Sequence, residues 1–307
     1  MAFTAKDVKE LREMTGVGMM DCKKALTASD GDMDKAVEWL REKGLAASQK
    51  KAGRIAAEGM AYAAVINGVG VVVEVNAETD FVGKNEKFVD FVKGVAQVVA
   101  EKAPADLDAL MACEYLDTGR TVTEQQQEMV LVIGENIKVR RFARYSEGLN
   151  VPYIHAGGKI GVLVNIETDV AETAKVEELG KDIAMQIAAM NPQFLDKSDV
   201  DEETIEKERN ILLIQAKTEN EKAAKPKPDA IIEKMVMGRI GKYYEENCLL
   251  QQNFVKGDKI SVEKHIAEVA KELGSNITVK GFVRFEKGEG IEKKQEDFAA
   301  EIASMVK

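Results

Sequence analysis

Apolar residues recur with helical spacing in the first part of the chain, residues 1–44. They appear every three or four positions, which places them on one face of an α-helix. Two tight loops, TGVG at 15–18 and SDGD at 29–32, divide the pattern into three runs, and Gly44 is a typical helix stop. The pattern predicts a bundle of three helices. Its apolar positions are Val8, Leu11, Met14, Met19, Cys22, Leu26, Ala36, Val37 and Leu40.

The second and third predicted helices add a more specific pattern. Ala25-Leu26 lies on one, and Ala-Val-x-Trp-Leu at 36–40 lies on the other. Together with the glycine loop, these residues resemble a ubiquitin-associated (UBA-like) module, which binds protein surfaces through the loop between its first two helices. Met19 and Met20 follow this loop. Because adjacent helical positions point about 100° apart, we expect one methionine to be buried and the other exposed.

Strand-like alternation begins after a small, basic segment at 45–57, which is typical of a linker. MAYAAVI and VGVVVEV flank Asn67-Gly68, and Asn-Gly between apolar runs is the strongest short signal of a β-hairpin. An amphipathic helix follows, then helical stretches near 105–118 and 122–134, and then the strand NIKVRRFARY.

This series of elements occurs twice. GENIKVRRFARYSEG at 134–148 aligns without gaps with GSNITVKGFVRFEKG at 274–288, and VNAETD at 75–80 aligns with VNIETD at 164–169. The period is too long for a solenoid. Two copies of hairpin, helix and closing strand instead predict two similar subdomains, each a small antiparallel sheet covered by helices.

The second copy contains an insertion over 196–246. Two helical segments there are separated by Lys225-Pro-Lys-Pro228, which predicts an antiparallel helical hairpin because proline ends a helix. Its charge is typical of a solvated arm, and the alternative is an association surface. A final helix is expected near 292–306. The expected α+β fold has a UBA-like bundle (1–44), a linker (45–57), core subdomain N (58–148), core subdomain C (149–195 and 247–288), a coiled-coil arm (196–246) and a C-terminal module (289–307).

The internal repeat separates shared features from features of one copy. Glu-Thr-Asp ends the hairpin in both copies, so Thr79 and Asp80 are expected to cap the following helix. The next residues differ: Phe81-Val82 in the first copy corresponds to Val170-Ala171 in the second. Phe81 is therefore not required by the shared fold. It could pack on the linker, act as a hydrophobic staple, or serve as an exposed anchor for a partner protein.

Composition narrows the classes of function. The net charge of −10 disfavours a protein that tracks nucleic-acid phosphates, which would carry a basic face. Three distant cysteines and two histidines give no disulfide framework, zinc site or His-based catalytic centre. The sequence contains no phosphate-binding, nucleophile-elbow or metalloprotease motif. With no apolar leader and no membrane-spanning run, we expect a cytoplasmic protein without catalytic residues, cofactor or bound metal.

Several long stretches carry a resemblance to a known family. They are LREMTGVGMMDCKKAL (11–26), EVNAETDFVGKNEKF (74–88), IGENIKVRR (133–141), HAGGKIGVLV (155–164) and the tail beginning FVRFEKGEGIEKK. They closely resemble bacterial elongation factor Ts, in the family's order and over essentially the whole chain. The combination of TGVGMMDCKKAL with TDFV is highly specific.

The resemblance implies guanine-nucleotide exchange on elongation factor Tu, a GTPase, by protein binding and not by covalent chemistry. It implies that Thr79, Asp80, Phe81 and Val82 form the element that disturbs the magnesium and phosphate site of the GTPase. It also places Arg12, Met19, Met20 and Lys23 on the N-terminal contact segment, and His155 matches a histidine in the second half of the core. No nucleic acid or membrane partner is implied. In some relatives the arm is linked to self-association, which is therefore a possible role of the arm here.

Two other classes of function remain as alternatives. A UBA-type adaptor on a duplicated scaffold would account for residues 1–44, but it leaves Phe81 and the tandem core without a role. An acidic metal-dependent hydrolase would use Glu78 and Asp80 with the second Glu-Thr-Asp. The two motifs lie on separate subdomains without further ligands, which disfavours this class.

Overall fold

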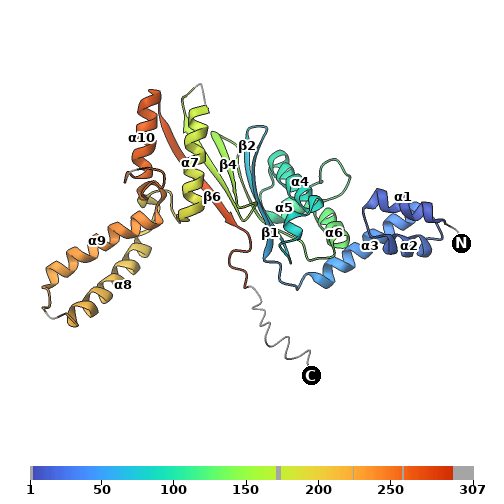
Figure 1. Cartoon of the computed structure of the whole chain (residues 1–307), viewed down its shortest axis with the longest axis horizontal. Helices are drawn as coiled ribbons and strands as arrows, with labels where there is room; N and C mark the ends of the chain where they lie inside the picture. Colours follow the sequence, from blue (N-terminus) through green and yellow to red (C-terminus); the bar gives the residue numbers. More distant parts are fainter. Residues whose placement is uncertain (1–2, 171–173, 224, 258, 293–307) are drawn as a thin grey trace. The chain divides into compact units, whose positions relative to one another are not determined.

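The computed structural model describes residues 3–170, 174–223, 225–257 and 259–292 (Figure 1). Contacts divide the chain into two compact units. The first unit contains the chain up to Arg144, the segment Ile154–Gly161 and the chain from Phe285 onward. The second contains Tyr145–Tyr153 and Val162–Arg284. Each unit is considered by itself.

The first unit begins with the three predicted helices, α1 (Ala5–Thr15), α2 (Met19–Ala28) and α3 (Met33–Lys51). Thr4 and Asp7 form a reciprocal capping box at the start of α1, and Asp32 caps α3. The helices bury a small apolar core. Its members are Val8, Leu11, Val17, Cys22, Ala25, Leu26, Ala36 and Leu40.

Two details of this bundle differ from the sequence-based expectation. Gly44 does not end the third helix, which continues to Lys51. Gly44 is buried, and a Cβ added there would lie 3.4 Å from the carbonyl oxygen of Gln127, so the glycine allows close packing of another helix. Met19 and Met20 are both exposed, at 49% and 65%, because Cys22 and Leu26 already fill the inward face of α2.

A three-stranded sheet follows in the order β1 (Glu58–Ile66), β2 (Val69–Ala77) and β3 (Lys138–Tyr145). Ile66 pairs with Val69 around the predicted Asn67-Gly68 turn. Both turn residues have positive φ, as a type I′ hairpin requires.

Three helices complete this subdomain: α4 (Glu86–Lys102), α5 (Leu107–Ala112) and α6 (Val122–Ile133). A short 3₁₀ helix, η1 (Val82–Lys84), precedes α4. The amphipathic α4 packs its apolar face on β1 and β2. The buried face of α4 includes Phe88, Phe91, Val92, Val95 and Val99.

The second sheet repeats this arrangement with β4 (Leu149–His155), β5 (Ile160–Thr168) and β6 (Ile277–Glu286) in that order. Helices α7 (Ala174–Met190) and α10 (Val262–Leu273) accompany it. Helix α10 lies 140 residues after α6 at both ends. Both helices end at a glycine with positive φ, Gly134 and Gly274. The fold is thus α+β with two small antiparallel sheets, as expected from the repeat.

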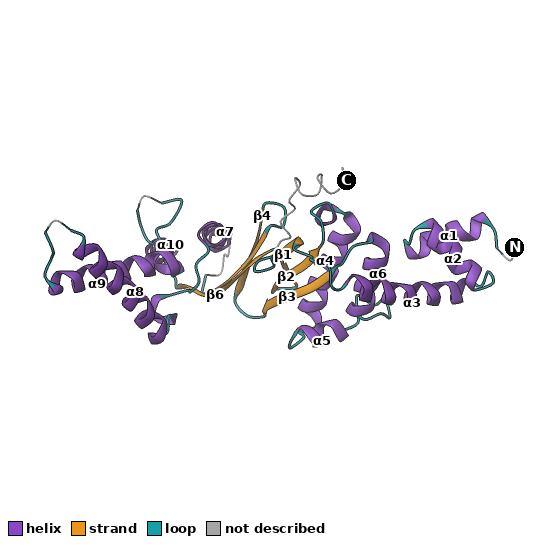
Figure 2. Cartoon of the chain, turned by 90° about the horizontal axis from the view of Figure 1, so that it is seen from below, coloured by secondary structure: helices purple, strands orange, loops and turns teal. Residues whose placement is uncertain are grey.

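The predicted helical hairpin is present as α8 (Glu202–Glu221) and α9 (Asp229–Asn247), which Figure 2 shows as two helices joined by a loop. Ala216, Ile232 and Val236 are buried between them. The hairpin is flanked by the 3₁₀ helices η2 (Lys197–Asp199) and η3 (Leu249–Gln251). The final helix expected near 292–306 lies almost wholly outside the described residues. No helix in the described part has the length and apolar content that crossing a membrane would need.

Candidate functional site

Phe81 lies on the turn that connects β2 to α4, and its side chain is 80% exposed. No other large apolar side chain in the described part of the chain is as exposed. The next residue, Val82, is buried in the core of the first sheet. Phe81 therefore neither packs on the segment 45–57 nor acts as a staple, and of the three sequence-based options only the exposed position agrees with the structure.

The expectation that Thr79 and Asp80 cap the next helix is wrong in the first copy. The cap of α4 is Asn85, whose Oδ1 accepts hydrogen bonds from the backbone N–H groups of Lys87 (3.0 Å) and Phe88 (3.4 Å). The turn of η1 separates Thr79 and Asp80 from the helix, so their oxygens do not reach its free N–H groups. Asp80 is exposed beside Phe81.

Thr79 instead binds Glu135, which follows α6. The Thr79 hydroxyl donates to Glu135 Oε1 at 2.7 Å, and the Thr79 backbone N–H donates to Oε2 at 3.0 Å. A reciprocal bond joins the neighbouring residues, because the Asn136 backbone N–H donates to Glu78 Oε1 at 2.6 Å. Two carboxylates thus connect the turn to the loop before β3.

A close backbone approach holds the other side of the turn. A Cβ at Gly83 would lie 2.8 Å from the carbonyl oxygen of Gly59 on β1, a distance that real Cβ contacts do not show. Glycine at this position lets η1 lie directly against the strand. The backbone around Phe81 is therefore fixed by contacts on both sides, while its ring projects into solvent.

The exposed turn shares a groove of about 400 Å³ with the N-terminal helices. Lys87 crosses this groove and donates from Nζ to the carbonyl oxygen of Gly16 at 3.2 Å. Arg12 and Phe81, which the sequence separates widely, line the same groove. The remaining lining residues are Gly16, Val17, Gly18, Val82, Asn85, Lys87, Val132 and Ile133.

The other candidate residues lie around or apart from this groove. Met19, Met20 and Lys23 are exposed on α2, directly after Gly18 of the groove. They do not line the groove themselves. His155 is exposed at the end of β4 and is not among the lining residues either. Its hairpin tip contacts β1, where the Ala61 N–H donates to the Gly158 carbonyl at 2.8 Å.

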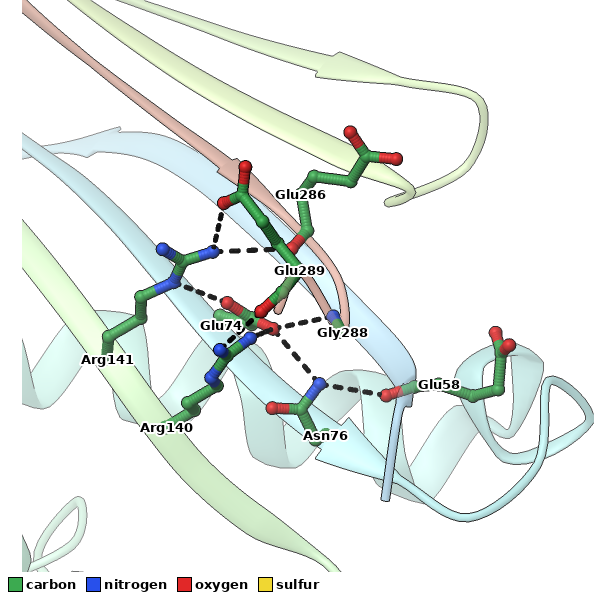
Figure 3. Close-up of polar contacts among 8 residues, drawn as sticks. All are labelled: Glu58, Glu74, Asn76, Arg140, Arg141, Glu286, Gly288 and Glu289. Atoms are coloured by element: carbon green, nitrogen blue, oxygen red, sulfur yellow. Dashed lines mark hydrogen bonds and ion pairs between the residues drawn. The ribbon is translucent and has the colours of Figure 1, made fainter. Parts of the chain in front are cut away.

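A buried carboxylate lies elsewhere in the first unit, at Glu74 on β2 (Figure 3). Its two oxygens contact Arg140 at 2.9 Å and Arg141 at 2.5 Å. The Gly288 backbone N–H donates to Oε1 at 2.8 Å. Burial acts to raise the pKa of Glu74, but the bonds from Gly288, Arg140, Arg141 and Asn76 outweigh it and lower the pKa. The side chain is therefore a buried anion bound to the C-terminal segment 286–289.

Sequence reasoning did not identify Glu135 or Lys87. A signal for Glu135 exists, because the aligned repeat segments place Ser275 at the corresponding position of the second copy. Glu135 thus differs between the copies, as Phe81 does. No comparable signal exists for Lys87, whose contact with Gly16 depends on how the first helices lie on the core.

Comparison with known proteins identifies the family. The family described as Elongation factor TS matches residues 78–289. Elongation factor Ts of Magnetococcus marinus is 50% identical over 308 residues, covering 100% of this chain and 99% of that protein. That of Clostridium perfringens strain SM101 is 53% identical over 99% of both chains, and that of Syntrophotalea carbinolica is 48% identical over 100% of both. The chain therefore belongs to the elongation factor Ts family of translation elongation factors.

Proposed function

We propose that this protein binds elongation factor Tu in its GDP form and promotes release of GDP, which GTP then replaces. The observation that carries this proposal is the exposed Phe81 on a turn fixed from both sides. A large exposed aromatic on a rigid backbone loses little conformational entropy when it enters a partner, which is the property of an interface anchor. The protein performs no covalent chemistry in this role.

The physical basis lies in how a GTPase holds its nucleotide. Backbone N–H groups cradle the phosphates, and Mg²⁺ bridges phosphate oxygens. Phe81 acts as a wedge between elements of the GTPase, while the exposed Asp80 adds negative charge near the water shell of the metal. Thr79 and Val82 fix the backbone on either side of Phe81, because Thr79 binds Glu135 and Val82 is buried.

In such an exchange, the factor and the nucleotide lower each other's affinity for the GTPase. If the factor lowers the affinity of the GTPase for nucleotide by some ratio, nucleotide lowers the affinity of the factor by the same ratio. The complex is then an intermediate from which incoming GTP expels the factor.

The other parts of the chain supply contact area in this proposal. The UBA-like module (1–44) binds the nucleotide domain of the GTPase through Arg12, Met19, Met20 and Lys23, with help from the C-terminal module (289–307). His155 belongs to the contact of core subdomain C (149–195 and 247–288) with a neighbouring domain. The arm (196–246) is the candidate surface for self-association, and a solvated arm is the alternative. No direct nucleic-acid or membrane contact is required, and the protein acts in the cytoplasm.

Release of fluorescent GDP from purified elongation factor Tu tests the proposal directly. The rate is measured after addition of excess unlabelled nucleotide, with increasing concentrations of this protein. We expect a rate that rises with concentration and reaches a plateau. A rate that stays at the intrinsic value at every concentration would refute the proposed function.

Phe81→Ala provides the residue-level test. We expect the plateau rate of GDP release to fall by at least about tenfold, the factor that about 1.4 kcal/mol of lost wedge interaction produces. The melting temperature should change little, because the ring is 80% exposed and contributes little to the core. Stopped-flow fluorescence and a thermal melt give the two values.

Val255→Ala is the matched control. Val255 is also an exposed apolar residue, at 50%, but it belongs to the second unit, whereas the turn belongs to the first. We expect it to leave both the plateau rate and the melting temperature unchanged. An unaltered plateau rate for Phe81→Ala would contradict the wedge.

A further inference from the structure

Comparing the two copies of the core shows which contacts accompany Phe81 in the first copy. In the second copy, Val170 stands at the position of Phe81 and Ser275 at that of Glu135. Thr168 there uses its hydroxyl oxygen locally, accepting from the backbone N–H of Val170 at 3.1 Å. Asn276 contacts Asp169 by its side chain at 3.4 Å. Among the described residues, such a connection of the threonine to a carboxylate thus occurs in the copy that carries the exposed aromatic and not in the other.

The geometry at Glu135 is that of a clamp. Both carboxylate oxygens are used on one residue, one on the Thr79 hydroxyl and one on its backbone N–H. Hydrogen bonds that involve an ionised group are about twice as strong as neutral ones. The backbone of Glu135 is itself placed by Gly134, which ends α6 with φ of 88° and whose carbonyl oxygen accepts a bond from Lys51.

The clamp acts two residues before Phe81. From Thr79, the chain passes through the exposed Asp80 to Phe81 and then to the buried Val82. Without the clamp, the turn would still be restrained by the bond from the Asn136 N–H to Glu78, by the burial of Val82 and by the approach of Gly83 to Gly59, but Thr79 itself would lose both of its bonds to Glu135. The ring of Phe81 would then sample more orientations, and binding would cost more conformational entropy because it selects one of them.

We propose that Glu135 is the positioning residue of the turn 79–82 and that it holds Phe81 in its binding orientation through Thr79. This inference rests on the proposed function, because its effect is read in nucleotide release. Glu135 does not need to touch the GTPase. Its effect on exchange passes through the aromatic side chain.

A double-mutant cycle between Glu135→Ala and Phe81→Ala tests the coupling. We expect Glu135→Ala to lower the plateau rate of GDP release about tenfold, which corresponds to about 1.4 kcal/mol. In the Phe81→Ala background the same substitution should change the rate less than twofold. An equal loss in both backgrounds, or no loss with Phe81 present, would overturn the proposal. Glu135→Gln keeps the shape and one acceptor, and we expect an intermediate loss.

Asp201→Ala is a control with the same donor set. Asp201 binds the backbone N–H and the hydroxyl of Thr204 at 2.7 and 2.8 Å, at the start of the arm. The substitution removes an equivalent pair of hydrogen bonds at a position distant in sequence from residues 79–82. We expect no change in the plateau rate of GDP release.

Hydrogen exchange of the Thr79 amide in the free protein supplies a readout independent of the GTPase. We expect faster exchange in Glu135→Ala than in the natural protein, and an unchanged rate would overturn the clamp. If the natural protein fails to stimulate release, the proposed function fails. If it stimulates release and Glu135→Ala does so equally, only the positioning role fails.

Discussion

Glu74 is a fully buried carboxylate whose negative charge is matched by Arg140 and Arg141. Removing one partner of a buried ion pair costs about 3–5 kcal/mol, because the remaining charges stay in a poorly solvated site. The Arg141 guanidinium also lies over the ring of Phe285 at 4.2 Å. The charge on Glu74 therefore fixes the positions of several side chains, although its neighbours along β2 are the valines Val73 and Val75.

The lowered pKa of Glu74 predicts how stability depends on pH. A carboxyl group whose pKa is lower in the folded state stabilises the fold above its unfolded pKa, and this contribution disappears as pH falls through the folded pKa. We expect Glu74→Gln to lower the free energy of unfolding at pH 7 by about 3 kcal/mol. The variant should also lose less stability than the natural protein between pH 5 and pH 3. Urea denaturation across that range measures both effects.

Glu272→Gln is the control for this prediction. Glu272 is also a paired carboxylate, since it contacts Lys175 at 2.6 Å and this contact lowers its pKa, but both side chains are exposed. Exposed pairs contribute little to stability. We expect Glu272→Gln to follow the pH profile of the natural protein. A parallel profile for Glu74→Gln would contradict the assigned role of the buried charge.

At the scale of elements, the long third helix connects the N-terminal bundle to the core. Helix α3 packs against α6 where Gly44 faces Gln127 and Leu131. The cavity beside this contact, of about 220 Å³, is lined by both helices and includes Leu40, Arg41 and Leu131. The bundle therefore contacts the core through this helix pair.

Gly44→Leu tests this helix contact. A side chain at Gly44 would meet the α6 backbone, and overpacking of this kind costs about 1–3 kcal/mol. We expect a lower melting temperature and an altered fluorescence of Trp39, the single tryptophan of the chain, which lies on the same helix. Gly238→Leu is the control, since Gly238 in α9 has open space around its Cβ position. That substitution should raise stability slightly, because leucine favours helix more than glycine does.

The elements that the sequence predicts correctly are those with strong local signals. Asn67-Gly68 determines its own turn, and the repeat reveals both sheets and the corresponding helices α6 and α10. The proline break likewise marks the loop between α8 and α9. These features depend on residues that are close in sequence, or on a pattern that occurs twice.

The sequence is a poorer guide where distant contacts decide the outcome. Gly44 lies inside a helix and faces α6, and Thr79 binds Glu135 across a separation of 56 residues instead of capping α4. The sequence leaves three possible roles for the Phe81 side chain, because its exposure depends on which distant segments pack against the turn. The burial of Glu74 was not foreseen, since the residues that cover it come from the end of the chain.

At the scale of the whole molecule, the first unit is discontinuous in sequence. Its sheet contacts the hairpin tip at 154–161 through Gly158 and the C-terminal segment through Gly288. Gly288 has φ of 71°, and a Cβ there would lie 2.0 Å from the Ala57 carbonyl oxygen, so the segment passes directly against the backbone before β1. Lys287 adds an ion pair with Glu58 at 2.5 Å.

Two truncated chains test how much this segment contributes. A chain that ends at Arg284 loses the Gly288 bond to Glu74 and the contact of Phe285 with Arg141, whereas a chain that ends at Glu292 retains both. A hydrogen bond to a buried charge contributes about 1.5–3 kcal/mol. We expect the shorter chain to melt about 5–10 °C below the longer one. Equal melting temperatures in a calorimeter would show that the segment does not stabilise the sheet.

The bond between Glu74 and Gly288 also sets an order of events during protein synthesis. Arg140 and Arg141 emerge from the ribosome soon after Glu74, but Gly288 lies 214 residues later. At about 5–20 residues per second, this interval lasts roughly 10–40 seconds. The nascent sheet carries its acidic side chain without the final donor throughout that time. A messenger that is cut short before Gly288 therefore yields a product in which Glu74 never receives this hydrogen bond.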